Sequence, residues 1–150
     1  MTAPKRRGVK PPREPEDAAL VLVVDDFEDN RAMYVEYLQF QGLRVAEAVN
    51  GEEAIERARM LMPAVIIMDL SLPVMDGWEA TRRLKADATT RHIRVVALTG
   101  HAEPAHAKRA LEAGCDDFVA KPCLPEQLLA KVREHLAQRP ASRKTQKGND

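Results

Sequence analysis

The chain has 150 residues, which is enough for one domain with a substantial hydrophobic core. Its 23 basic and 23 acidic side chains balance, so net charge gives no reason to expect binding to nucleic acid or to a membrane. No apolar run approaches the ~18 residues of a membrane span, and the charged, proline-bearing N-terminus lacks the apolar stretch of a secretory signal. We therefore expect a cytoplasmic protein.

Residues 1–19 are basic and rich in proline, and residues 139–150 are basic without an apolar stripe. Such compositions cannot bury enough apolar area to fold. We therefore expect two disordered tails around a single domain at residues 20–138. Its two cysteines, Cys115 and Cys123, are too few for a disulfide scaffold and lack zinc-site spacing, so reduced thiols are expected.

The first part of the domain begins with the apolar run 20–24, which is typical of a strand buried on both faces of a parallel sheet. Residues 28–41 have helical spacing, and Gly42 is suited to end that helix. Residues 43–48 alternate between apolar and polar side chains, as an edge strand would. Asn50 caps the next helix, whose expected buried stripe is Ala54, Ala58 and Leu61.

The second part contains three more expected strands, at residues 64–69, 93–98 and 117–120. Helical spacing marks residues 77–86 and the stretch that leads to Gly114. The last helix starts near Pro125, ends near Gln138 and is expected to bury Leu128, Leu129, Val132 and Leu136. The histidines expected on the surface are His92, His106 and His135.

Strand and helix thus alternate five times along the domain. This alternation predicts an α/β fold, a flavodoxin-like doubly wound sheet of five parallel strands in the order 2-1-3-4-5 with helices on both faces. Right-handed crossovers place the carboxyl end of every strand at the same edge. Residues that follow the strands should therefore meet there.

Polar residues follow four of these strands. Asp25 and Asp26 follow the first, Asp69 the third, Thr99 the fourth and Lys121 the fifth. Three converging carboxylates repel one another unless a cation lies between them, and Mg²⁺ takes carboxylate oxygens while keeping several waters. Lys121 and Thr99 could then balance the charge of a phosphoryl group on Asp69, since an aspartyl carboxylate can accept one covalently. Each residue alone has an ordinary explanation as a turn former, cap or surface charge, so the conjunction carries the prediction.

With these residues identified, the chain resembles the receiver domain of response regulators in two-component signalling, and in particular stand-alone receivers of the chemotaxis-regulator type. The resemblance covers roughly residues 20–138. It is carried by Val23-Val24-Asp25-Asp26, Met68-Asp69, Leu72-Pro73-Val74-Met75-Asp76-Gly77, Ala97-Leu98-Thr99-Gly100 and Phe118-Val119-Ala120-Lys121-Pro122.

The resemblance implies that Asp69 accepts a phosphoryl group from a sensor histidine kinase or a histidine phosphotransfer protein. It implies Mg²⁺ as the cofactor, held by Asp25, Asp26, Asp69 and the backbone carbonyl of Ser71. Lys121 would bind the phosphoryl group. The protein would then be a signalling switch that assists only its own phosphorylation and dephosphorylation, and not an enzyme in the usual sense.

The family's output implies that Thr99 moves toward the phosphoryl group and that Phe118 follows inward. The face made by the fourth helix, the fifth strand and the fifth helix would change and meet a downstream protein. The resemblance also implies that the Lys121–Pro122 bond is cis.

The chain departs from the usual pattern at Phe118, which lacks the hydroxyl of the tyrosine often found there, so only inward packing is expected of it. Ser71 and His101 lie two residues past Asp69 and Thr99, at positions that tune the phosphoryl lifetime in this family. A neutral imidazole at His101 could orient the attacking water, or His101 could simply be a solvated residue at a helix start.

Little sequence follows the last helix, so we expect a stand-alone receiver, a monomer or weak homodimer, that presents a changed surface or passes the phosphate on in a relay. Three alternatives stay open. The first is a receiver-fold adaptor that does not use phosphorylation. The second is a flavodoxin-like cofactor binder, disfavoured by the anionic stretch 25–29, and the third is a Mg²⁺-dependent phosphatase of the haloacid-dehalogenase class, whose Asp-x-Asp after the first strand is missing.

Overall fold

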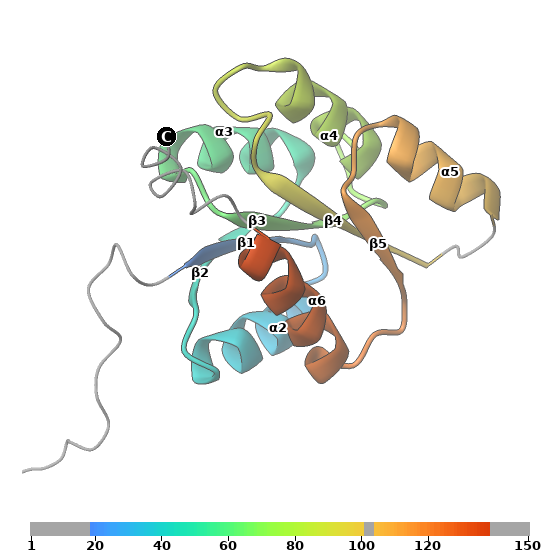
Figure 1. Ribbon diagram of the computed structural model, residues 1–150. Coiled ribbons are helices and arrows are strands. Elements are labelled where there is room, and N and C mark those ends of the chain that lie inside the picture. The colour runs from blue at the N-terminus through green and yellow to red at the C-terminus, as the bar shows by residue number, and fades with distance from the viewer. Residues whose placement is uncertain (1–18, 101–103, 139–150) are drawn as a thin grey trace, which may run out of the picture.

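The computed structural model describes residues 19–100 and 104–138. Their five strands form one parallel sheet in the order β2-β1-β3-β4-β5 (Figure 1). The strands are β1 (Leu20–Val24), β2 (Arg44–Ala48), β3 (Val65–Asp69), β4 (Arg94–Thr99) and β5 (Asp117–Ala120). The helices are α2 (Glu28–Phe40), α3 (Gly51–Leu61), α4 (Gly77–Ala86), α5 (Pro104–Glu112) and α6 (Pro125–Gln138). The predicted fold and strand order are confirmed. The expected tails and His101 lie outside the described residues.

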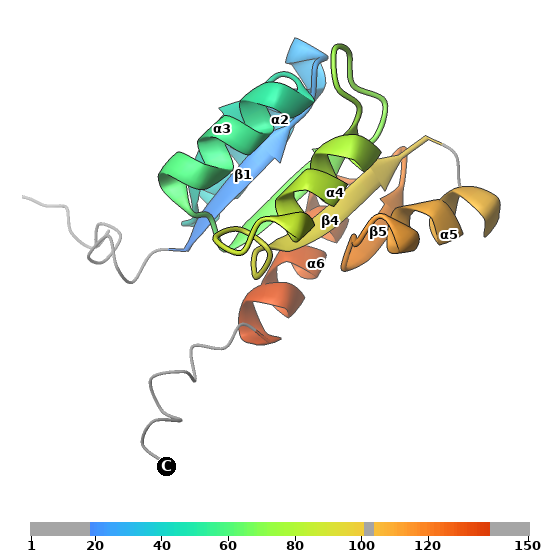
Figure 2. The ribbon, with the colours of Figure 1, turned by 90° about the horizontal axis from the view of Figure 1, so that it is seen from above.

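The helices cover the sheet in two layers, with α3, α4 and α5 on one face and α2 and α6 on the other (Figures 1 and 2). Each layer has its own apolar core, because strands buried on both faces send alternate side chains to opposite sides. Leu22 and Ile66 pack toward the first layer, while Val21 and Ile67 pack toward the second. The unbroken apolar runs are what this burial requires.

Local signals predicted most element ends. The side chain of Asn50 accepts a hydrogen bond from the backbone N–H of Glu53 at 2.8 Å, as a helix cap does. Gly42 has φ +96°, a left-handed conformation that favours glycine after a helix. The prediction for Leu61 was wrong: this side chain is 38% exposed because α3 ends there and the chain turns away through Met62.

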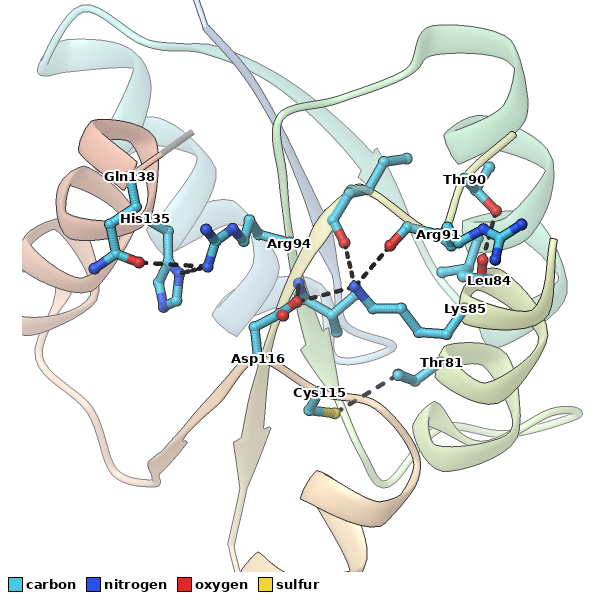
Figure 3. Close-up of polar contacts among 12 residues, drawn as sticks. Thr81, Leu84, Lys85, Thr90, Arg91, Arg94, Cys115, Asp116, His135 and Gln138 are labelled. Carbon is cyan, nitrogen blue, oxygen red and sulfur yellow. Dashed lines mark hydrogen bonds and ion pairs between the residues drawn. The ribbon is translucent and has the colours of Figure 1, made fainter. Parts of the chain in front are cut away.

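A polar network ties the helices to the amino ends of β4 and β5, away from the carboxyl edge (Figure 3). The Lys85 ammonium on α4 donates to the carbonyls of Arg91 and Ile93 and lies 3.0 Å from Oδ2 of Asp116. The Asp116 carboxylate also accepts from the backbone N–H of Val95 at 2.8 Å. One lysine therefore joins α4 to the loop before β4 and to the start of β5.

His135 was predicted to lie on the surface, and this prediction was wrong. Its side chain on α6 is buried, with Nε2 3.0 Å from Oδ2 of Asp117 and Nδ1 3.5 Å from a guanidinium nitrogen of Arg94. Partners on β4 and β5 replace the water that an exposed imidazole would have. His92 is exposed, as predicted.

Both cysteines are buried free thiols, and burial raises the pKa of Cys115 to about 11. Such thiols carry little thiolate at neutral pH and are poor nucleophiles. Among the helices described between residues 19 and 138, none has the length and apolar character needed to cross a bilayer.

Candidate functional site

Strand pairing brings the predicted site residues to one edge of the sheet. Met68 on β3 pairs with Val24 on β1, and Asp69 pairs with Leu98 on β4. Asp25 therefore lies next to the end of β3, and Thr99 one residue beyond the partner of Asp69. The next pair, Thr99 with Ala120, places Lys121 at the same edge.

Three carboxylates form an acidic cluster there, made of Asp25, Asp26 and Asp69. One oxygen from each lies within 4.8 Å of the others. Asp25 is 1% exposed and Asp69 is 3% exposed, whereas Asp26 faces solvent. Two buried like charges at this distance are unfavourable unless a cation compensates them.

Asp25 carries the clearest sign of a missing partner. Its Oδ1 accepts from the backbone N–H of Phe27 at 2.9 Å, but its buried Oδ2 has no hydrogen-bond partner among the described residues. Burial raises the pKa of this carboxyl, and the nearby Asp69 carboxylate raises it further. A hard cation with oxygen ligands, such as Mg²⁺, would satisfy the orphaned oxygen and offset the repulsion, so the donor set fits it.

Asp69 is held at both oxygens. Oδ1 accepts from the backbone N–H of Ser71 at 3.0 Å, and Oδ2 accepts from the Lys121 ammonium at 3.1 Å. The backbone N–H of Lys121 donates to the carbonyl of Thr99 at 2.7 Å, which links the ends of β4 and β5. The Lys121–Pro122 bond is cis, as the resemblance implied.

Two residues of the loop after Asp69 fix the start of α4. The Asp76 side chain accepts from the backbone N–H of Glu79 at 2.9 Å and so caps α4. A Cβ at Gly77 would lie 2.5 Å from the carbonyl oxygen of Asp69, so only glycine lets α4 start this close to β3. Asp76 and Gly77 therefore position α4 against the end of β3.

The predicted switch residues, Thr99 and Phe118, lie on the next two strands of the sheet, β4 and β5. Thr99 is buried at the end of β4. Phe118 on β5 is half-buried, pairs with Ala97 and packs against the core under α3, α4 and α5. Ser71 is exposed.

Two residues of α2 that were not predicted as site residues contact the loops of the site. A guanidinium N–H of Arg31 donates to the carbonyl of Asp25 at 2.9 Å, and the hydroxyl of buried Tyr34 donates to the carbonyl of Cys123 at 3.0 Å. The available signal was their i, i+3 spacing just after the acidic pair, which places both on one side of the helix.

This arrangement agrees with comparisons to known proteins. The family model for the response regulator receiver domain matches residues 21–133. The chain belongs to this family of signalling proteins. Among curated relatives, it is 32% identical over 116 residues to the polar-differentiation response regulator DivK of Brucella anthropi, covering 77% of this chain and 94% of DivK.

The receiver also matches part of a longer relative. It is 38% identical over 116 residues to the response regulator PleD of Caulobacter vibrioides, which is 77% of this chain but only 26% of PleD. The chemotaxis response regulator CheY4 of Vibrio cholerae superposes with a TM-score of 0.75 at 30% identity, over 79% of this chain and 98% of CheY4. A putative response regulator from Chloroflexus aurantiacus superposes with a TM-score of 0.76 at 30% identity, over 80% of this chain and 98% of the other.

Proposed function

We propose that this receiver is a phosphoacceptor switch of the cytoplasm, in which Asp69 takes a phosphoryl group from a phosphohistidine. The donor would be a sensor histidine kinase or a histidine phosphotransfer protein. The observation that carries the proposal is that Asp69 shares one acidic cluster with Asp25 and Asp26 while the Lys121 ammonium lies 3.1 Å from its Oδ2. One carboxylate thus lies between a cation site and a fixed positive charge.

The reaction forms a bond between a carboxylate oxygen of Asp69 and phosphorus. The P–N bond to the donor imidazole breaks, and its electron pair stays with the nitrogen. Asp25, Asp26, Asp69 and the carbonyl of Ser71 would hold Mg²⁺. The bound ion would supply positive charge to the phosphoryl oxygens. Lys121 binds a further phosphoryl oxygen, so the protein contributes mainly positioning and charge neutralisation.

The proposed output uses Thr99 and Phe118. The Thr99 hydroxyl would bind a phosphoryl oxygen, and Phe118 would pack further inward on β5. The surface of α5, β5 and α6 would then favour a second conformation that a downstream protein recognises, a population shift driven by new charge-assisted contacts. Ser71 and His101 would set how long the phosphoryl group survives.

The test is to incubate the protein with Mg²⁺ and acetyl phosphate and to measure intact mass. Wild type should gain one phosphoryl group, and Asp69→Asn should gain none. Asp76→Asn is the matched control, because Asn caps a helix as well as Asp does, and it should be phosphorylated like wild type. A wild type without added mass, or an Asp69→Asn variant with as much, would overturn the proposal.

The same experiment separates the proposal from an adaptor that does not use phosphorylation, for which no variant gains mass although the fold is intact. Adding a histidine phosphotransfer protein to the phosphorylated receiver separates a terminal output from a relay. A relay intermediate should lose its phosphoryl group to a histidine phosphotransfer protein, whereas a terminal receiver should lose it only by hydrolysis.

A further inference from the structure

Helix α2 contacts both loops that build the site. Arg31 and Tyr34 lie three positions apart, so their side chains leave the helix on the same side. Arg31 reaches the loop after β1, which carries the acidic pair, and Tyr34 reaches the loop after β5, which carries Lys121. One helix face therefore connects the two halves of the site.

Arg31 fixes the peptide group that joins the two acidic residues. Its guanidinium donates to the carbonyl of Asp25 at 2.9 Å and to Oε1 of Glu47 on β2 at 2.8 Å. The Arg31 side chain is 15% exposed, while that of Glu47 is 48% exposed. Water screens the Glu47 ion pair, so the bond to the Asp25 carbonyl is the more consequential one.

Tyr34 fixes the chain two residues beyond Lys121. Its hydroxyl donates to the carbonyl of Cys123 at 3.0 Å in a buried contact. Burial raises the pKa of Tyr34, so the phenol stays protonated and able to donate. The backbone N–H of Lys121 is tied to Thr99 at 2.7 Å on the other side. The backbone around Lys121 is thus held both by α2 and by the end of β4.

We propose that Arg31 and Tyr34 are positioning residues with separate duties. Arg31 holds the acidic pair, Asp25 and Asp26, in the orientation that binds the cation. Tyr34 holds the backbone beside Lys121 so that the Lys121 ammonium lies next to Asp69. This proposal rests on the proposed function. It goes further in stating that one residue of α2 positions the acidic loop after β1 and another positions the Lys121 loop after β5.

Arg31 is tested by the affinity for Mg²⁺ alone, measured by isothermal titration. Coulomb's law predicts that removing a positive charge near the acidic pair tightens Mg²⁺ binding, whereas loss of positioning weakens it. We expect Arg31→Met to weaken binding about tenfold, the cost typical of losing an outer-shell contact. Arg57→Met is the matched control, because Arg57 donates to the carbonyl of Glu47 at 2.9 Å but not to the acidic loop.

Unchanged or tighter Mg²⁺ binding by Arg31→Met overturns the assignment of Arg31. Thermal unfolding establishes that each variant is folded, and Arg31→Gln replaces Arg31→Met if the latter is not. At saturating Mg²⁺, the Arg31 variant should regain the phosphorylation rate of wild type with acetyl phosphate.

Tyr34 is tested with Tyr34→Phe, which keeps the ring and removes only the hydroxyl. Mg²⁺ affinity should stay unchanged, while the rate of phosphorylation at saturating Mg²⁺ should fall about tenfold. Tyr37→Phe on the same helix is the control and should behave like wild type. The side-chain NMR resonances of Lys121 should shift in Tyr34→Phe but not in Tyr37→Phe.

These readouts separate the inference from the proposed function. If wild type accepts no phosphoryl group, the proposed function fails, while Mg²⁺ affinity and the Lys121 resonances still decide the roles of Arg31 and Tyr34. If wild type is phosphorylated and both variants match their controls in every measurement, the inference alone fails.

Discussion

The Lys121 ammonium lies 3.1 Å from Oδ2 of Asp69, and it does so from the loop that directly follows β5. The Lys121 side chain is 25% exposed and that of Asp69 is 5% exposed, so the ion pair sits where the site opens to solvent. A cation in this place is available to a phosphoryl oxygen as soon as one arrives.

We predict that Lys121→Gln slows phosphorylation by acetyl phosphate about 100-fold, because one fixed positive contact to the transferring group is lost. Mass spectrometry over time measures the rate. Lys131→Gln is the control, since Lys131 on α6 also pairs with a carboxylate, that of Asp117 at 3.0 Å, but does so at the amino end of β5, whereas Lys121 follows the carboxyl end of that strand. Equal rates for the two variants would contradict the role of Lys121.

Asp25→Asn should raise the melting temperature of the metal-free protein by a few degrees. The reason is that burial and the neighbouring Asp69 carboxylate raise the pKa of Asp25, so its ionised form is costly and the folded state loses stability as pH rises through that pKa. Saturating Mg²⁺ should reverse the order, because a cation that binds only the folded wild type stabilises it by mass action. Thermal unfolding in EDTA and in Mg²⁺ measures both effects, and a variant less stable than wild type in EDTA would refute the argument.

Trp78 should report the conformational switch. It is the protein's single tryptophan, and the Arg109 guanidinium of α5 lies 3.8 Å from its ring centroid. Movement of α5 on phosphorylation would alter this cation–π contact and hence the indole emission. We predict a fluorescence change when acetyl phosphate and Mg²⁺ are added to wild type, and none in Asp69→Asn. Arg109→Met should reduce the change, and an undiminished signal in that variant would show that the contact is not its source.

The fold was predictable because the local sequence pattern is enough to identify its central strands. The stretch Val65–Asp69 is buried at every position, so an unbroken apolar run marks it, whereas the edge strand Arg44–Ala48 exposes its charged residues, Arg44 and Glu47. Parallel connectivity then brings the strand ends together whatever the details of packing. That is why Asp25, Asp69 and Lys121 could be grouped before any geometry was known.

Contacts between distant polar atoms could not be predicted in this way. Tyr34 belongs to the stretch 28–41, whose spacing predicted a helix, but its hydroxyl donates to a carbonyl 89 positions away, which no local pattern indicates. Lys85 and Asp116 are 31 positions apart, and nothing in either local pattern marks the pair. His135 was misplaced for the same reason, since its burial depends on Asp117 and Arg94 accommodating its ring nitrogens.

Lys85→Met should lower the free energy of unfolding by about 2 kcal/mol, because two carbonyls and the Asp116 carboxylate lose their shared donor (Figure 3). Urea unfolding measures the change, and Mg²⁺ affinity should stay that of wild type because the network lies away from the acidic cluster. Arg59→Met is the control: the Arg59 side chain, paired with Asp87, is 57% exposed against 20% for Lys85, so its loss should leave stability unchanged. Comparable losses in the two variants would show that Lys85 is no more than a surface charge.

Asp117 should make stability depend on pH in the acid range. Burial raises its pKa, but the hydrogen bonds from Lys131, His135 and the backbone N–H of Phe118, together with the Lys131 charge, lower it by more, so the pKa lies below the ordinary value of 3.8. The stabilisation from the ionised carboxylate is therefore complete above the unfolded-state pKa and is lost as pH falls through the lower folded-state pKa. We predict that the difference in unfolding free energy between wild type and Asp117→Asn shrinks as pH falls below 3.8. Urea unfolding from about pH 6 to pH 2 measures it. Because Lys131 supplies part of the shift, the Lys131→Gln background should show a weaker dependence, and parallel stability profiles for wild type and Asp117→Asn across this range would rule out the effect.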